Sequence, residues 1–420
     1  MSARASSSDK NWTILVWIAG DNDLSDFGAI DLAELKQVGS GAKVNLVAQY
    51  DRSGTTGTRR FFLRKGTTLE ADVVADLGET NTGDPKVAID FFTWGIRTYP
   101  SKHVMCVLWN HGSGIDETDI YARARALGPT GRAGVAVAPL TRNHARAIAA
   151  SGMSRALFAS TIDQAVRSKA IAYDDTSRDF LDNMELAKVV ATVVRNTGRK
   201  IDVIGFDACL MNMLEIGYQL RGSASYLVGS EETEPGDGWP YDKVAAATTR
   251  AASSTPARLA AAIVRTYVAS YAKDPNEDRV TQSAVDLARA DALTKAVDGL
   301  ASACIANLQA ASDYMAFSQS VNGALRFEMR DFVDLGDLCK RLAGRSTNDE
   351  VVAAAKAVTA ALSGPRGFVV SRGHKGAGVA AATGTTIYFP LAGDVHVAYD
   401  QLDFARRTRW PELIARFRDG

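Results

Sequence analysis

The sequence predicts an α/β fold built around a mainly parallel central sheet. Through the first half of the chain, short apolar runs of strand length alternate with longer segments of helical periodicity. This alternation is typical of strands joined by crossover helices, which places neighbouring strands parallel. The apolar runs are almost uninterrupted, as expected for strands covered by helices on both faces. In such sheets the functional site lies beyond the carboxyl ends of the strands.

The elements of the first half follow in order. The apolar run over 12–19 predicts a buried strand that ends at Gly20, and helical spacing over 26–38 ends at Gly39. Asp84 and Pro85 begin a helix that runs through 96, because proline is favoured in a first helical turn. The other elements expected here are strands over 43–50, 59–63, 69–76, 103–109, 201–206 and 226–229, and helices over 184–196 and 210–220. The strands over 59–63 and 69–76 are expected to form a short hairpin or paired edge strands.

The second half has a different pattern. Residues 246–420 are expected to form a mostly helical region with strands that return to the sheet, and residues 11–245 to form the core that carries the site. The helices expected here cover 256–271, 291–311, 331–342 and 351–362, and the strands cover 367–371 and 385–389. The polar residues 1–10 are predicted to be disordered.

One segment interrupts the pattern. Residues 115–169 are rich in Ala, Gly and Arg and have weak periodicity. An insert of this length without structure in a compact domain is usually functional or disordered. It is either a solvated surface insertion or an activation linker.

Composition excludes several classes of protein. The chain has 420 residues, 46% hydrophobic and 23% charged, with a formal net charge of +0, so no overall field attracts nucleic acid or an acidic membrane. No stretch approaches the roughly 18 apolar residues of a membrane helix. No secretory signal is recognisable, so the expected compartment is the cytoplasm, or the exterior if a signal peptide has been removed. The oligomeric state stays open.

The residues that indicate chemistry stand at two strand ends. Cys209 follows the strand over 201–206, and His111 follows the strand over 103–109, just before Gly112. A cysteine and a histidine at the ends of two strands are a candidate nucleophile and base. A helix beginning directly after Cys209 would favour its thiolate. The other cysteines, Cys106, Cys304 and Cys339, are expected to be core thiols, since there is no CxxC or zinc spacing.

Several motifs together resemble the clostripain family of cysteine peptidases. They are, in order, Trp12–Leu24, Trp109-Asn-His-Gly-Ser-Gly114, Ala172–Phe180, Asp207-Ala-Cys-Leu-Met-Asn-Met213, Ser230–Trp239, Asp331–Leu338 and Ile387-Tyr-Phe-Pro390. The resemblance implies a caspase-like α/β/α sandwich with a mainly parallel central sheet, followed by the C-terminal, mostly helical extension.

The resemblance also implies residue roles. His111 and Cys209 match the family's catalytic dyad, with the backbone N–H groups of Gly112 and Cys209 holding the oxyanion. Asp207 matches an acidic residue that supports a preference for Arg, or Arg and Lys, before the cut bond, and Asp237 is a second substrate-binding candidate. Asp207 alone is equally compatible with a strand-end residue, and Asp237 with a turn between glycines.

The resemblance further implies protein or peptide substrates containing Arg or Lys, and a zymogen that cuts itself between His111 and Cys209, within 115–169. No cofactor is required. The acidic loop at Asp21 and Asp23 leaves a Ca²⁺ site open, but it lacks the spacing of an EF-hand, and a turn or helix cap is favoured, with Asp23 or Ser25 as the cap.

Two other readings compete with a peptidase. A catalytically silent caspase-like scaffold could bind peptides or protein partners, but it would not need both His111 and Cys209. A nucleotide-binding doubly wound protein would need a glycine-rich phosphate loop after the first strand. The chain has Gly20-Asp-Asn-Asp23 there, which would repel phosphate.

Overall fold

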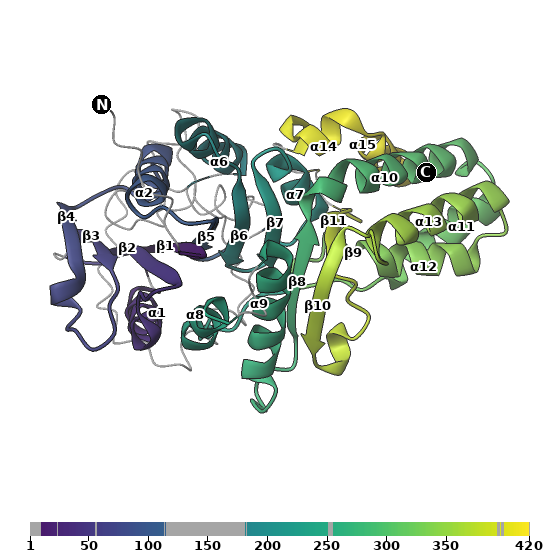
Figure 1. Ribbon diagram of the computed structural model, residues 1–420. Helices are drawn as coiled ribbons and strands as arrows, with labels where there is room; N and C mark the ends of the chain where they lie inside the picture. The colour runs from purple at the N-terminus through teal and green to yellow at the C-terminus, as the bar shows by residue number, and fades with distance from the viewer. Residues whose placement is uncertain are drawn as a thin grey trace, which may run out of the picture.

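A nine-stranded sheet forms the centre of the molecule (Figure 1). The computed structural model describes residues 10–22, 24–54, 57–112, 114, 181, 183–250, 255–392, 395 and 399–419. The strand order is β10-β8-β7-β6-β5-β1-β2-β3-β4, with the five strands from β7 to β2 parallel and those at both edges antiparallel. The strands are β1 Trp12–Gly20, β2 Val44–Arg52, β3 Gly57–Phe62, β4 Val73–Gly78, β5 His103–Trp109, β6 Ile201–Asp207, β7 Ala224–Gly229, β8 Val280–Asp286 and β10 Val369–Lys375. The predicted mainly parallel sheet is confirmed.

Helices cover both faces of this sheet (Figure 1). One face carries α2 (Pro85–Thr98), α6 (Asn183–Thr197) and α7 (Leu214–Leu220), and the other carries α1 (Ser25–Val38), α8 (Tyr241–Thr248) and α9 (Pro256–Tyr271). Successive side chains of a strand point to opposite faces, and β1 divides accordingly. Its residues Leu15 and Trp17 belong to one apolar cluster, while Val16 and Ile18 belong to the other. The uninterrupted apolar runs therefore reflect burial on both faces.

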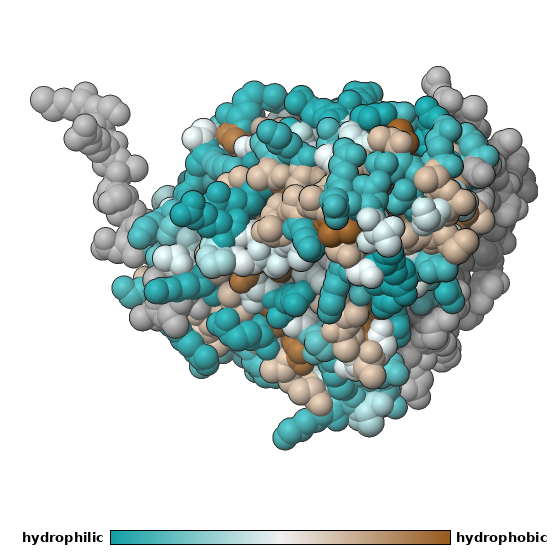
Figure 2. Space-filling view, turned by 90° about the vertical axis from the view of Figure 1, so that its right-hand side faces the viewer, coloured by the Kyte–Doolittle hydropathy of each residue, from teal (hydrophilic) through white to brown (hydrophobic). Residues whose placement is uncertain are grey.

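The C-terminal half adds a helical layer beside the β8–β10 edge (Figure 1). Its helices are α10 Ala290–Asn307, α11 Ala311–Gly323, α12 Leu335–Arg345, α13 Asp349–Leu362, α14 Asp403–Arg407 and α15 Trp410–Asp419. Short 3₁₀ turns are η1 Glu70–Asp72, η3 Leu287–Arg289, η4 Ala377–Val379 and η5 Tyr399–Gln401. The outer face of this layer is mostly hydrophilic with scattered hydrophobic residues (Figure 2). Within the described ranges, no helix has the length and apolar character needed to cross a membrane.

The second half departs from the expectations in three places. The single helix expected over 291–311 ends at Asn307, and a separate helix, α11, begins at Ala311. The segment expected as a helix over 331–342 opens with the strand β9 (Phe332–Asp334). β9 pairs with β11 (Thr386–Tyr388) in a separate two-stranded sheet, so β11 does not return to the main sheet.

The strand β8 was not predicted, because its polar residues interrupt the apolar pattern that is typical of a buried strand. Thr281, Gln282 and Ser283 interrupt the apolar pattern, yet all three are buried. Their side chains bond to the loops beyond β6 and β7, so burial of this strand depends on hydrogen bonding as well as apolar packing. Residues 255–392 thus supply both β8 and β10 to the central sheet.

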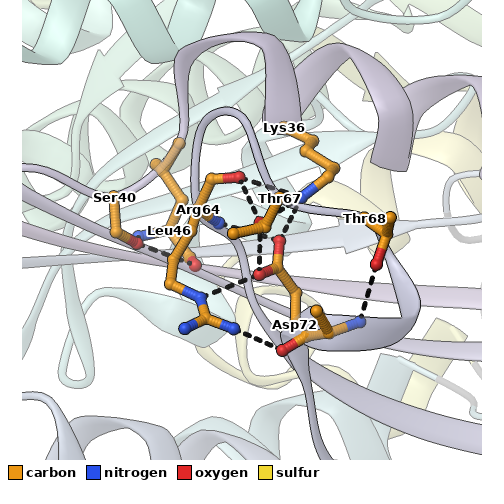
Figure 3. Close-up of polar contacts among 8 residues, drawn as sticks. Lys36, Ser40, Leu46, Arg64, Thr67, Thr68 and Asp72 are labelled. Carbon is orange, nitrogen blue, oxygen red and sulfur yellow. Dashed lines mark hydrogen bonds and ion pairs between the residues drawn. The ribbon is translucent and has the colours of Figure 1, made fainter.

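A polar network fixes the β3–β4 hairpin to α1 (Figure 3). The fully buried carboxylate of Asp72 accepts from the side chains of Lys36, Arg64 and Thr67 and from the backbone N–H of Arg64, which lies 2.9 Å away. Burial by itself would raise the pKa of Asp72. The hydrogen bonds from Arg64, Lys36 and Thr67 outweigh it and lower that pKa to about 2.

Replacing Asp72 with Asn should lower the free energy of unfolding by roughly 2 kcal/mol at neutral pH. The folded-state pKa lies below the unfolded value of 3.8, so the stabilisation is complete above about pH 4 and is lost as pH falls toward 2. Denaturant unfolding of wild type and variant at several pH values measures this difference.

Asp76→Asn is the matched control on the same hairpin. Asp76 pairs with Arg59 at 3.0 Å, but its side chain is 53% exposed, and exposed pairs contribute only about 0–1 kcal/mol. Equal losses of stability for the two variants would show that the buried Asp72 network contributes no more to the free energy of unfolding than an exposed ion pair does.

Candidate active site

The pairing of β5 with β6 brings the histidine and cysteine motifs together. Trp109 is the register partner of Asp207, and the backbone N–H of Asn110 donates to the carbonyl oxygen of Asp207 at 3.3 Å. Beyond the strand ends, Gly112, the residue after His111, lies against the backbone of Cys209. The two strands therefore bring the loops that carry His111 and Cys209 to the same edge of the sheet.

Gly112 packs directly on the backbone of Cys209. A Cβ atom at Gly112 would lie 2.2 Å from the carbonyl oxygen and 2.9 Å from the nitrogen of Cys209. No side chain fits in that space, so glycine is required by the close approach of the two loops. This contact joins the residue after His111 to Cys209 itself.

The sulfur of Cys209 lies against the loop that follows β7. The backbone N–H of Glu234 donates to Sγ at 3.2 Å, and the carbonyl oxygen of Glu234 lies 3.9 Å from Sγ. Cys209 is partly exposed, but burial raises the pKa of its thiol to about 12, and the carboxylates of Glu234 and Glu232 act in the same direction. The backbone N–H groups of Glu234 and Gly112 oppose this rise. In this arrangement, burial and the neighbouring carboxylates oppose ionisation of the Cys209 thiol.

The helix after Cys209 does not adjoin the thiol, contrary to expectation. α7 begins at Leu214, because Leu210 adopts φ = 64°, a left-handed conformation that ends regular structure. The N–H of Leu210 donates to the carbonyl oxygen of Glu232 at 3.1 Å, and that of Asn212 to the carbonyl of Ser230 at 2.9 Å. The turn after Cys209 thus hydrogen-bonds to the loop that follows β7. The N-terminus of α7 does not adjoin Cys209, so the dipole of this helix does not stabilise a thiolate there.

The loop after β1 supports the histidine motif. The side-chain amide of Asn22 donates to the carbonyl oxygen of Ala19 at 3.0 Å and to Oδ1 of Asn110 at 3.4 Å. The same Oδ1 accepts from the backbone N–H of His111 at 2.5 Å. The residue at the N-cap of α1 is Leu24, without a side-chain cap, so Ser25 does not cap the helix, and Asp23 lies outside the described residues. The turn is instead made by Oδ1 of Asn22, which accepts from the N–H of Leu24 at 2.9 Å.

Asp207 lies in a buried group of carboxyl groups, here called the acid cluster: Asp31, Asp207 and Glu234. Asp207 is 4% exposed and accepts from the backbone N–H of Trp239 at 3.3 Å. Burial raises the pKa of Asp207 to about 6. Burial and the neighbouring Asp207 raise the pKa of both Asp31 and Glu234 well above the usual range. Because the backbone N–H of Glu234 donates to Sγ of Cys209, the acid cluster lies directly beside the thiol.

Asp237 lines a cavity next to this cluster. The cavity has a volume of about 250 Å³, and its lining includes Asp31 and Glu34 of α1 together with Asp237 and Gly238. A Cβ atom on Gly238 would lie 3.1 Å from the carboxylate of Asp207, so the wall of the cavity rests on that residue. The structure thus brings both predicted substrate-binding residues, Asp207 and Asp237, to one place.

Three acidic residues of this region were missed in the sequence. Asp31 and Glu34 lie three residues apart on one side of α1, where they look like ordinary exposed helix residues. Asp31 instead is buried and accepts from the indole N–H of Trp109 at 2.6 Å. Glu234 was visible as part of an acidic motif, but the pattern does not tell which acidic residue points inward.

Buried polar contacts hold the loop over 230–234. Glu232 pairs with Arg279, whose Nη2 lies 2.6 Å from its Oε2, and accepts from the backbone N–H of Glu328 at 3.0 Å. The hydroxyl of Thr281 accepts from the N–H groups of Glu231 and Glu232 at 3.1 and 3.0 Å. The segment that contacts Sγ is therefore fixed by β8.

Other predicted features have simpler outcomes. Cys106, Cys304 and Cys339 are free and buried, as expected for core thiols. The described residues contain no group of three or more His, Cys, Asp or Glu side chains arranged to hold a metal ion. The insert over 115–169 and residues 1–9 lie outside the described residues.

Comparison with protein families agrees with this geometry. The model of Peptidase C11, the clostripain family, matches residues 16–129 and 159–417. The chain belongs to the clostripain family. It is therefore a cysteine peptidase, a hydrolase, and the family resemblance read from its motifs is confirmed. Comparison with curated protein sequences gave no match.

Solved structures show the same fold. One is a secreted C11 cysteine protease from Bacteroides thetaiotaomicron in complex with an irreversible peptide inhibitor, with 20% identity, a TM-score of 0.63, and coverage of 96% of this chain and 99% of that one. Another is an inactive zymogen C11 protease from Parabacteroides distasonis, with 18% identity, a TM-score of 0.62, and coverage of 94% and 97%. The expected caspase-like α/β architecture is confirmed.

Gly112→Ala should reduce peptidase activity at least about 100-fold, because the added methyl group would push His111 and the Gly112 N–H away from Cys209. Gly222→Ala is the matched control, since a Cβ atom there meets nothing within 4 Å. Turnover of a peptide reporter and thermal melting of both variants make the comparison. Wild-type turnover by Gly112→Ala would disprove the close contact.

Proposed function

We propose that this clostripain-family enzyme is an endopeptidase that cleaves after Arg, or Lys, by a His111–Cys209 dyad. The observation that carries the proposal is the close contact of Gly112 with the backbone of Cys209. Buried acidic groups lie beside the thiol. The dyad needs His111 next to Cys209, and the register of β5 and β6 supports that placement.

The proposed reaction follows from these groups. His111 takes the proton of the Cys209 thiol, and the resulting thiolate attacks the scissile carbonyl and forms a C–S bond. The C–N bond then breaks as protonated His111 gives that proton to the leaving amine. The acyl-enzyme is then hydrolysed by water that His111 deprotonates. The N–H groups of Gly112 and Cys209 are the proposed oxyanion donors. The chemistry requires only groups of this chain and no cofactor.

The proposed specificity rests on uncompensated negative charge. Asp207 is nearly fully buried, and in the described part of the chain no Lys or Arg forms an ion pair with it. A guanidinium or ammonium group of the substrate would supply the missing positive charge, and a guanidinium could pair bidentately. Asp237, on the wall of the adjacent cavity, is the second proposed contact.

The state of the thiol supports activation by cleavage. Burial holds the pKa of Cys209 at about 12, far from the lowered values of reactive cysteines. We propose that the intact chain is a resting form, and that self-cleavage within 115–169, outside the described residues, lets the site adopt its reactive arrangement. The similar C11 protease structure from Parabacteroides distasonis is that of an inactive zymogen, which is compatible with this proposal.

Reporters ending in Arg, Lys or Asp test the specificity. The wild-type enzyme should cleave after Arg, and Cys209→Ala and His111→Ala should each lower turnover by at least about 1,000-fold. His374→Ala, on the exposed side of β10, should keep wild-type turnover. Turnover that survives in Cys209→Ala, or cleavage only after Asp, would refute the proposed dyad or specificity.

Mass spectrometry of the purified protein tests self-cleavage. Wild-type protein should separate into two fragments whose junction falls between His111 and Cys209, while Cys209→Ala should stay a single chain. Trypsin nicking of the Cys209→Ala protein shows whether the insert is accessible. An active wild-type preparation with an intact mass would rule out activation by cleavage.

A further inference from the structure

The backbone N–H of Glu234 is a hydrogen-bond donor to the sulfur of Cys209, at 3.2 Å. An N–H group bonds a charged acceptor more strongly than a neutral one, so this contact stabilises the thiolate relative to the thiol. Burial, followed by the carboxylates of Glu234 and Glu232, raises the pKa of the same thiol. The position of this N–H group therefore matters for forming the nucleophile.

The loop that carries this donor is held by a hydroxyl group of β8. Oγ1 of Thr281 accepts from the backbone N–H groups of Glu231 and Glu232, at 3.1 and 3.0 Å. It also lies 2.9 Å from the hydroxyl oxygen of Ser230. A hydroxyl accepts two hydrogen bonds and donates one, so the Thr281 proton goes to Ser230. All these residues are buried, and bulk water would not replace a lost bond there.

The next two side chains of β8 hold the segments on either side of the thiol. Gln282 donates to Oε1 of Glu234 at 3.1 Å. The hydroxyl of Ser283 accepts from the side-chain amide of Asn212 at 2.6 Å, in the turn that follows Cys209. Successive side chains of a strand point to opposite faces of the sheet. A strand from the C-terminal half thus contacts the surroundings of the sulfur from both faces.

The hydroxyl of Thr281 can be removed without changing a charge near the thiol. The loop has a second anchor, the ion pair of Glu232 with Arg279 at 2.6 Å. Removing Arg279 would leave the buried Glu232 carboxylate uncompensated, which would change the electrostatics around Cys209 as well as the position of the loop. Valine has nearly the shape of threonine but neither accepts nor donates a hydrogen bond. Thr281→Val therefore isolates the position of the loop.

We propose that Thr281 is a positioning residue of the active site, whose hydroxyl holds the loop over 230–234 so that the N–H of Glu234 stays on Sγ of Cys209. Thr281 acts through this loop and not on the substrate. The inference rests on Cys209 as the proposed nucleophile, which Cys209→Ala tests by itself. It does not depend on a preference for Arg or Lys.

Kinetics of the activated enzyme, with a peptide reporter that the wild type cleaves, test the inference. Thr281→Val should lower kcat at least about tenfold, because two buried N–H groups lose their acceptor and the loop shifts. KM should stay within about threefold of the wild-type value, since in the described part of the chain no hydrogen bond joins Thr281 to Asp207 or Asp237. Thr281→Ser keeps the hydroxyl and should retain at least about a third of the wild-type kcat.

Thr294→Val is the matched control. Thr294 is 4% exposed, and its hydroxyl has no hydrogen-bond partner among the described residues. The same substitution there removes no bond and should keep the wild-type kcat. Thermal melting of every variant separates loss of fold from loss of rate. If Thr281→Val is too unstable to assay, Ser230→Ala decides, because it removes the acceptor of the Thr281 proton and should lower kcat at least about threefold.

Three results would overturn the inference. They are a wild-type kcat in Thr281→Val, an equal loss in Thr281→Ser or Thr294→Val, and an unchanged kcat in Ser230→Ala. None of them affects the proposed nucleophile so long as Cys209→Ala abolishes turnover.

Discussion

The parallel pairing of β5 with β6 is the constraint on which the site depends. Trp109 lies opposite Asp207, so the residues that follow each strand emerge side by side. A shift of one residue would turn every side chain to the other face of the sheet. It would exchange the positions of apolar and acidic groups and separate the two motifs. The glycine that follows His111 then allows the two loops to touch, because any side chain at Gly112 would collide with Cys209.

In contrast to the strand pairing, which stabilises the fold, the acid cluster is unfavourable for stability because it buries carboxyl groups. Burying a carboxyl group without a cation is costly unless the group is protonated or well hydrogen-bonded. Trp109, Trp239 and Gln282 supply donors, but no described cation balances the cluster. The two large apolar clusters on either side of the sheet stabilise the fold enough to retain it. Residues that lower the stability of the fold are expected at a functional site, where they are kept for their chemistry.

The sequence predicted most of the fold because buried parallel strands are apolar on both faces. The runs ending at Gly20, Trp109 and Asp207 could be read directly, and so could the placement of His111 and Cys209 beyond them. β8 was missed because its Thr281 and Gln282 are buried for hydrogen bonding and not for apolar packing. A pattern of hydrophobicity cannot reveal such a strand.

The site was predicted less completely than the fold, for a related reason. Asp31 lies far from Asp207 in sequence, and only the packing of α1 on the sheet brings them together. α7 begins several residues after Cys209 because of the left-handed turn at Leu210. A leucine in the sequence does not predict a left-handed backbone conformation. Glu234 is inward because of the loop's bonds to Cys209 and β8, and these are long-range contacts that no local pattern encodes.

A structure of the enzyme after reaction with an Arg-containing chloromethyl ketone would test the central claim most directly. The account predicts a thioether bond at Sγ of Cys209, and guanidinium nitrogens within hydrogen-bond distance of the carboxylate of Asp207. A guanidinium that points into solvent, or a reagent attached to another cysteine, would contradict it.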